Sequence, residues 1–191
     1  MNPTILVLFV IVLAVLVILV LLYNSLIGLR NGVDQAASSI DVMLKKRADL
    51  IPNLIATVQQ YMSHERATLT ELTELRTRAI SSSAPLEERV AVDAQAAALM
   101  SRIVVAAEAY PELKASDNFV LLQRSLNESE EQISAARRAY NAAATALNNA
   151  VDMIPTSLLA GPMGITRRAL FAATEAERAN VDVGALFGAN R

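Results

Sequence analysis

The sequence lacks cysteine and has a single histidine, His64, among its 191 residues. Without cysteine there is no disulfide framework and no thiolate to act as a nucleophile or metal ligand. One histidine cannot build a multi-histidine metal site, and Thr68 stands where the HExxH pattern of zinc peptidases needs its second histidine. The sequence therefore predicts no catalytic residue, no metal ligand and no cofactor-binding residue.

Aromatic residues are also scarce: they make up 4% of the chain, and tryptophan is absent. Stacking platforms for nucleotide bases are built from such side chains. The charges nearly cancel, with 17 basic and 19 acidic residues and a net charge of −2. A surface that follows the phosphates of a nucleic acid needs a basic excess. We therefore expect no nucleic-acid partner.

Apolar residues, in contrast, are abundant near the beginning of the chain. Residues 5–22 are eighteen consecutive apolar residues, and the first charged side chain belongs to Arg30. At about 1.5 Å per residue, a helix of this length spans about 27 Å, close to the hydrocarbon thickness of a bilayer. A signal peptide would need a basic start and a cleavage motif of small residues, and both are missing. We predict an uncleaved single-pass anchor in residues 1–22, with the lipid bilayer as a partner; Arg30 slightly favours a cytoplasmic domain.

The rest of the chain has the apolar spacing of helices and no alternating strand pattern. Prolines divide it into helical segments, of which the third covers residues 86–110. In the fourth, after Ser116 as its N-cap, apolar or small residues recur every three or four positions from residue 119 to residue 150, which is typical of bundle packing. The glycine-containing residues 155–191 read as a tail with one short helix near residues 168–178.

The stretch LKKRADLIPNL, residues 44–54, places charges and a proline inside a helical pattern. One interpretation is a turn between two helices, with Asp49 as the cap of the second helix and Pro52 in its first turn. The other is a continuous, kinked helix, because the seven-residue apolar spacing continues across the proline from Leu44 to Val58.

The same stretch belongs to a longer resemblance. Residues 23–69, with DLIPNL at their centre, resemble the opening of the LemA family. Residues 109–141 resemble the second signature of that family, and IPTSLLAG at residues 154–161 resembles the start of its closing segment. The resemblance implies a bacterial membrane protein without an agreed enzymatic activity, in a family with one branch tied to magnetosome membranes.

The fold that this resemblance implies is all-α. It consists of an N-terminal single transmembrane helix, residues 1–22, and an up-and-down four-helix bundle, residues 23–154. An irregular C-terminal tail, residues 155–191, would pack on the bundle or on a neighbour. This arrangement favours the turn interpretation, with the turn near residues 47–50.

Tyr140 and Asn141 repeat the Tyr-Asn pair at residues 23–24, and each pair is followed by another asparagine seven residues on. The two pairs are either a polar clamp near the membrane or structural motifs, namely interfacial tyrosines and helix-end asparagines. We favour the structural interpretation.

Glu130 and Arg137 flank the apolar stripe of the fourth helix. We expect them to form ion pairs with Arg30 or Asp34 of the first helix. Exposed pairs of this kind contribute only about 0–1 kcal/mol.

The predicted third helix is more apolar than one core-facing stripe requires. Residues 103–107 are five apolar residues in a row, and at about 100° per residue such a run surrounds the helix. Ala98 and Val105, seven residues apart, are therefore expected to face away from the core. Either the tail or a second copy of the chain must cover them, and we predict that they are self-association residues.

These observations favour a non-catalytic, membrane-anchored scaffold or oligomeric assembly protein. Its rigid helical bundle would bind copies of itself and other proteins, including a membrane protein partner. The alternative is an adaptor that presents substrates to a membrane protease or to export machinery.

Overall fold

The computed structural model of the protein describes residues 3–62, 65–80 and 84–172. Within these ranges every regular element is a helix, so the all-α prediction is confirmed. The helices are α1 (Pro3–Val58), α2 (Arg66–Ile80), α3 (Leu86–Ala106), a 3-10 turn η2 (Ala107–Ala109), α4 (Pro111–Lys114), α5 (Asp117–Asp152) and α6 (Ser157–Ala160).

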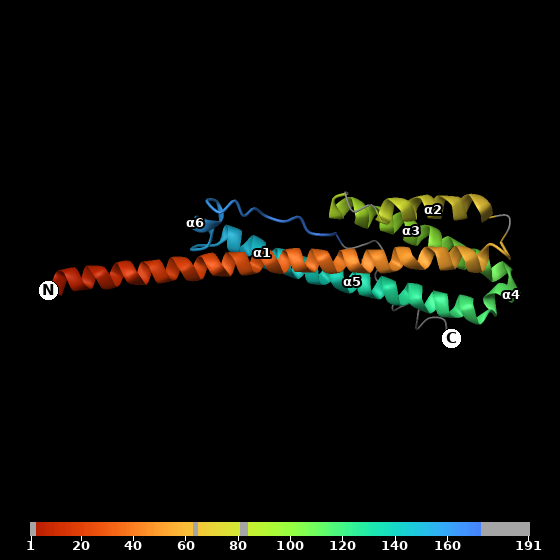
Figure 1. Ribbon diagram of the computed structural model, residues 1–191, viewed down its shortest axis with the longest axis horizontal. Coiled ribbons are helices and arrows are strands. Elements are labelled where there is room, and N and C mark those ends of the chain that lie inside the picture. The colour runs from red at the N-terminus through yellow and green to blue at the C-terminus, as the bar shows by residue number, and fades with distance from the viewer. Residues whose placement is uncertain (1–2, 63–64, 81–83, 173–191) are drawn as a thin grey trace, which may run out of the picture.

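Helix α1 is 56 residues long and has two different halves. Its large apolar side chains from Ile5 to Leu21 are exposed, and this half projects beyond the rest of the molecule (Figure 1). Burial begins at Leu26 and then recurs on one face as far as Val58. The exposed half is long and apolar enough to cross a membrane, and the predicted boundary after residue 22 lies inside a continuous helix.

A second segment, Leu86–Ala109, also has the length and apolar composition of a membrane span. In this case the composition serves a protein core. Val92, Ala96, Leu99 and Ile103 of α3 are buried against α1 and α2.

The turn predicted near residues 47–50 is wrong, because α1 continues through this region with Pro52 inside it. Asp49 is not a helix cap, and Pro52 is not in a first turn. The seven-residue spacing explains the result: Leu44, Ile51 and Val58 are all buried, and a continuous helix keeps them on one core-facing side. Burying that stripe outweighs the one helix hydrogen bond that a proline removes.

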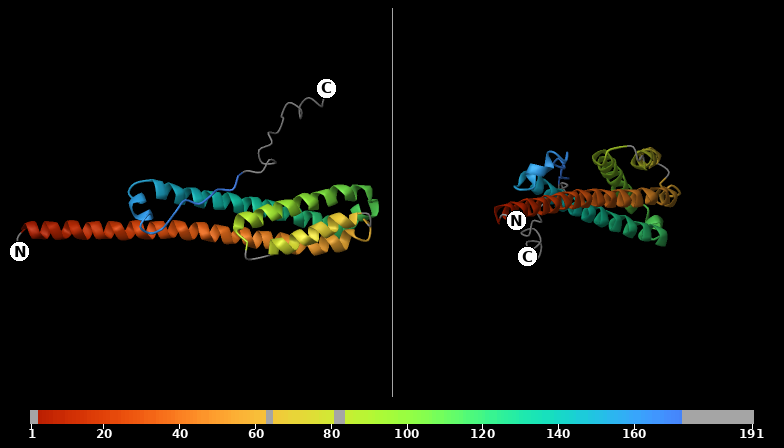
Figure 2. Two further views of the ribbon diagram at one scale, coloured as in Figure 1. Left: turned by 90° about the horizontal axis from the view of Figure 1, so that it is seen from above. Right: turned by 60° about the vertical axis from the view of Figure 1, so that its left-hand side comes forward.

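The long helices lie side by side in two pairs. Helix α5 returns along α1 in the opposite direction, and α2 and α3 form a shorter hairpin beside the half of α1 farthest from the N-terminus (Figures 1 and 2). The core has two parts, and the predicted stripe of α5 lines both. Phe119 and Leu122 lie in the part shared with α2 and α3, and Tyr140 and Leu147 lie in the part closer to the exposed apolar half of α1. Ser116 directly precedes α5 as predicted, although its side chain makes no capping hydrogen bond.

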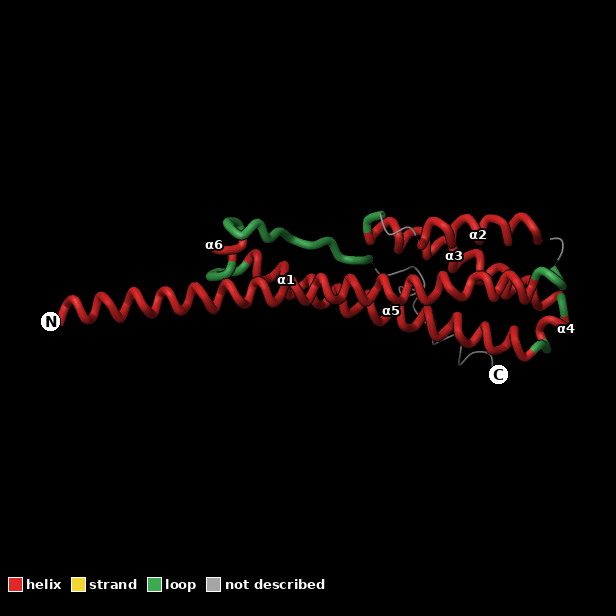
Figure 3. Tube along the Cα trace, viewed as in Figure 1, coloured by secondary structure: helices red, strands yellow, loops and turns green. Residues whose placement is uncertain are grey.

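The chain after α5 turns back on itself. Residues 165–172, which we call the strap, are not helical and run along α5 toward the α2–α3 hairpin (Figure 3). The short helix predicted near residues 168–178 is therefore absent as far as residue 172, and its remainder lies outside the described residues. The strap lies beside α5 and α1 in the part of the domain closer to the exposed apolar half of α1, which α2 and α3 do not reach (Figure 3).

Candidate functional site

One turn of α1, residues 45–49, contacts each of the other three long helices, and we call this turn with its partners the polar junction. At its centre, the Arg47 side chain is buried, with only 3% of the residue exposed. Its Nη1 donates a hydrogen bond to Asp93 Oδ2 of α3 at 2.8 Å, and its Nη2 donates one to Glu130 Oε2 of α5. Arg47 Nε lies 3.5 Å from the buried Ser129 Oγ. One guanidinium thus joins three helices.

The electrostatics of the junction are those of a buried ion network. Burial raises the pKa of the Asp93 carboxyl from 3.8 to about 6. The Arg47 guanidinium acts against this rise, while the negative charge of Glu130 adds to it. Desolvation is the larger effect, because Asp93 is 7% exposed, whereas the Glu130 carboxylate reaches solvent. With a pKa of about 6, the Asp93 carboxyl is mostly ionised at neutral pH, beside the Arg47 cation.

The backbone carbonyl of Ala48 makes the link to α2. In a regular helix this oxygen would accept the N–H of residue 52, and Pro52 has no N–H to donate. Arg76 of α2 replaces the missing donor, since its Nε donates a hydrogen bond to Ala48 O at 3.3 Å. Pro52 therefore leaves the Ala48 carbonyl without a backbone donor, and a side chain of α2 donates to it instead.

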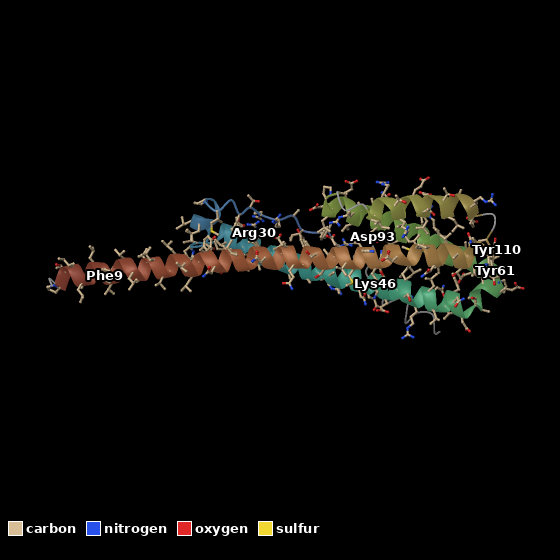
Figure 4. The ribbon with its side chains drawn as sticks, viewed as in Figure 1. Phe9, Arg30, Lys46, Tyr61, Asp93 and Tyr110 are labelled. Atoms are coloured by element: carbon tan, nitrogen blue, oxygen red, sulfur yellow. The ribbon has the colours of Figure 1, made fainter. Side chains whose placement is uncertain are left out.

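The solvent side of the junction carries two lysines. Lys45 pairs with Asp49 within α1 at 3.0 Å, which is the role of Asp49 in place of the predicted cap. Lys46 Nζ donates to Gln132 Oε1 of α5 at 3.0 Å and lies 3.4 Å from Glu128 Oε1. In Figure 4, Asp93 and Lys46 lie at one level along α1, on the sides that face α3 and α5.

The junction has the chemistry of a structural element. Each charge at its centre is paired within the protein, and the described residues contain no group of three metal-ligating side chains. His64 lies outside the described residues. A cavity of about 240 Å³ between α3 and α5 borders Arg47, with Met100, Val104 and Leu126 among its lining residues. The ion network fixes how α1, α3 and α5 slide and rotate against one another, because each charge finds its partner in one register only.

A second polar arrangement holds the strap. Asn148 of α5 donates from Nδ2 to Arg168 O at 2.9 Å and accepts the Arg168 N–H at Oδ1 at 2.8 Å. Asn141 repeats this pair of bonds with Phe171, at 2.8 and 2.9 Å. Two turns of helix advance about 10.5 Å and three extended residues about 10 Å, so the two spacings match. The asparagine amides thus satisfy strap backbone groups that no strand pairs with.

Side chains reinforce this attachment. Tyr140 is buried, and its ring centroid lies 5.0 Å from that of Phe171. Arg137 donates from Nη2 to Ala172 O at 2.9 Å, and its guanidinium carbon lies 5.6 Å from the Phe171 ring centroid. Arg168 Nη2 lies 3.4 Å from Asp34 Oδ1 of α1. The strap therefore joins α5 to α1.

Several predicted contacts are replaced by others. Glu130 pairs with Arg47, and Arg137 binds the strap, so the prediction that they pair with Arg30 or Asp34 is wrong. Tyr140 and Asn141 both contact Phe171 of the strap, and their assignment as a structural motif stays a prediction. The other Tyr-Asn pair, at residues 23–24, is exposed on α1.

The predicted self-association residues lie together on α3. Val105 is 65% exposed, and Ala98 is exposed on the same face two turns away. As far as residue 172, the hydrogen bonds and ion pairs of the strap are made with α5 and α1 and not with this face of α3. Self-association through these residues stays a prediction.

Sequence reasoning missed the centre of the junction, although one signal was available. Arg47 lies seven residues after Ile40 and seven before Leu54, both of which are fully buried. A charged residue at a core position of a heptad needs a buried partner. The partner itself, Asp93, is 46 residues away and carries no comparable signal.

Comparison of the sequence with known proteins finds relatives over most of the chain. The LemA family profile matches residues 36–184. The chain is 28% identical over 167 residues to Protein LemA of Metamycoplasma hominis, an alignment that covers 85% of this chain and 74% of that protein. It is 22% identical over 185 residues to each of two proteins of Paramagnetospirillum magneticum, Magnetosome protein MamQ 1 and Magnetosome protein MamQ 2, covering 84% of this chain and 68% of each relative. Because the profile spans most of the chain, including the polar junction and the strap, the protein belongs to the LemA family.

Proposed function

We propose that the protein is a non-catalytic, membrane-anchored scaffold. The apolar half of α1 crosses a bacterial membrane once, and the remaining long helices, in up-and-down order, form a rigid bundle on one side of it. Arg30, the first charged residue after the apolar run, favours the cytoplasmic side. The bundle binds further copies of the chain and other proteins.

The observation that carries this proposal is the outward face of α3. Val105 and Ala98 expose apolar atoms about 10.5 Å apart on one side of a helix, far from the membrane-spanning segment. The small side chain of Ala98 permits close approach of another helix. Anchoring concentrates the copies in two dimensions, which favours association through a modest apolar surface. The fully paired junction supports rigidity and offers no reactive group.

The test is photo-crosslinking of the full chain in bacterial membranes, with a photoreactive residue in place of Val105. The matched control carries it in place of Val42, which is 60% exposed on α1. We expect a ladder of homotypic products from position 105 and none from position 42. The substitution Val105→Glu, made in a chain that carries the photoreactive residue at Ala98, should abolish the ladder, while Val42→Glu should preserve it.

Other outcomes have definite meanings. A single heterotypic product with a membrane protease or an export component, without a ladder, supports the adaptor function in place of the scaffold. No product specific to position 105 contradicts assembly through this face.

A further inference from the structure

The connection between α5 and the strap has an unusual composition. Residues 153–166 contain no charged side chain, and this segment is bounded by Asp152 and Arg167. Those two residues pair with each other, Arg167 Nη1 lying 2.7 Å from Asp152 Oδ2. The ion pair closes the segment into a loop, which includes α6. We call residues 153–166 the end loop; its last two residues are also the first two of the strap.

The end loop buries Ile165 and half-buries Leu159 and Met163, but three of its large apolar side chains are exposed. Met153 is 63% exposed, Ile154 79% and Leu158 70%. Residues 50–62 are likewise uncharged, but there Ile51 and the other large apolar residues are mostly buried in the core. The uncharged composition of residues 50–62 is therefore explained by core packing. In the end loop, core packing does not explain the exposed apolar side chains.

The end loop lies at the end of the folded domain that is nearest to the apolar half of α1 (Figures 1 and 2). Ala160 of the loop packs in one cluster with Leu26 of α1. Leu26 is four residues, or about 6 Å along the helix axis, beyond the end of the apolar run at Leu22. The headgroup layer on each side of a bilayer is about 5–7 Å deep, so the loop lies at the depth of that layer.

We propose that the end loop is a second membrane contact, in which Met153, Ile154 and Leu158 insert into the lipid interface beside α1. The occupant is the bilayer that holds the apolar half of α1 in the proposed function, because the exposed side chains belong to the end of the folded domain nearest to that half (Figures 1 and 2). An uncharged apolar segment enters the boundary between headgroups and acyl chains readily, since it carries no charge to desolvate. The contact fixes the tilt and rotation of the domain relative to the membrane. It is independent of self-association through α3.

The chain has no tryptophan, so a single introduced tryptophan reports its own surroundings without background. We would introduce Ile154→Trp into the full chain and reconstitute it in phosphatidylcholine vesicles at high lipid-to-protein ratio. The matched control is Leu121→Trp, at a position of α5 where the leucine is 61% exposed. Residue 121 is 31 residues, or about 46 Å, from the end of α5 at Asp152.

We expect Ile154→Trp to emit at shorter wavelength than Leu121→Trp. Lipids brominated on the upper acyl chain should quench the fluorescence of Ile154→Trp strongly and leave that of Leu121→Trp unchanged. Leu158→Trp should behave like Ile154→Trp, which keeps the test decisive if one variant fails to fold.

Two results overturn the proposal. If both end-loop tryptophans are as water-exposed and as weakly quenched as the control, the loop is in solvent. If they emit at short wavelength but brominated lipids do not quench them, another part of the chain or a second copy covers the loop instead of lipid.

Discussion

Pro52 and Arg76 are linked through the backbone carbonyl of Ala48, and a double-mutant cycle can test this link. Arg76→Met keeps an unbranched apolar stem and removes the donor that lies 3.3 Å from Ala48 O. Ala48 is buried, and Pro52 provides no alternative N–H. An unsatisfied buried carbonyl costs about 1–3 kcal/mol, so the free energy of unfolding should fall by that amount.

The second arm of the cycle is Pro52→Ala, which restores an N–H at the position that normally bonds to Ala48 O. This variant alone should gain stability, up to about 3 kcal/mol, because proline is the least favourable residue inside a helix. In its background, Arg76→Met should cost almost nothing, since the carbonyl again has a backbone donor. The coupling energy between positions 52 and 76 should therefore be about 1–3 kcal/mol.

The assay is urea denaturation of the full chain in mild detergent, followed by circular dichroism. Arg78→Met, in the last turn of the same helix and exposed, is the control and should change stability little in either background. Equal costs of Arg76→Met with and without Pro52 would refute the reasoning. In that case Arg76 would contribute through packing or charge, and the proline would have no part in docking α2.

Three further predictions follow from the polar contacts. Asn148→Ala removes two hydrogen bonds to Arg168, or about 1–3 kcal/mol of local stability, so trypsin should cleave after Arg168 about 5–150 times faster. The control Asn149→Ala, at the exposed neighbouring position, should leave this cleavage rate unchanged. The folded pKa of Asp93, about 6, is above its ordinary value of 3.8, so the contribution of Asp93 to stability is complete below about pH 4 and is lost as the pH rises through about 6. Denaturation at several pH values should show the wild type losing stability relative to Asp93→Asn over this range, and a constant difference would contradict the raised pKa. Arg47→Met leaves two carboxylates without their shared cation and should lower the free energy of unfolding by about 3–5 kcal/mol at neutral pH, and a neutral effect would show that the network contributes only specificity.

The sequence by itself determined the helical content, the start of α3 and the limits of α5. The exposed half of α1 follows from residues 5–22 being apolar without interruption. The limits of α5 follow from Ser116 before it and Pro155 after it, and the exposure of Ala98 and Val105 follows from helical spacing. All of these properties depend on residues within one or two turns of each other, which is the range over which propensity and periodicity act.

Only the tertiary structure decided what the charged and polar residues do. Arg47 finds Asp93 at a separation of 46 residues and Glu130 at a separation of 83, and Asn148 finds the strap 20 residues further on. Local rules allowed both a turn and a helix at Pro52, and the turn was the prediction that the sequence favoured. The helix prevails because α5 and α3 bury a continuous stripe along α1, and because Arg76 supplies the donor that the proline lacks. Such pairings depend on which helices lie side by side and in which register, and that is a property of the packed core and not of any one segment.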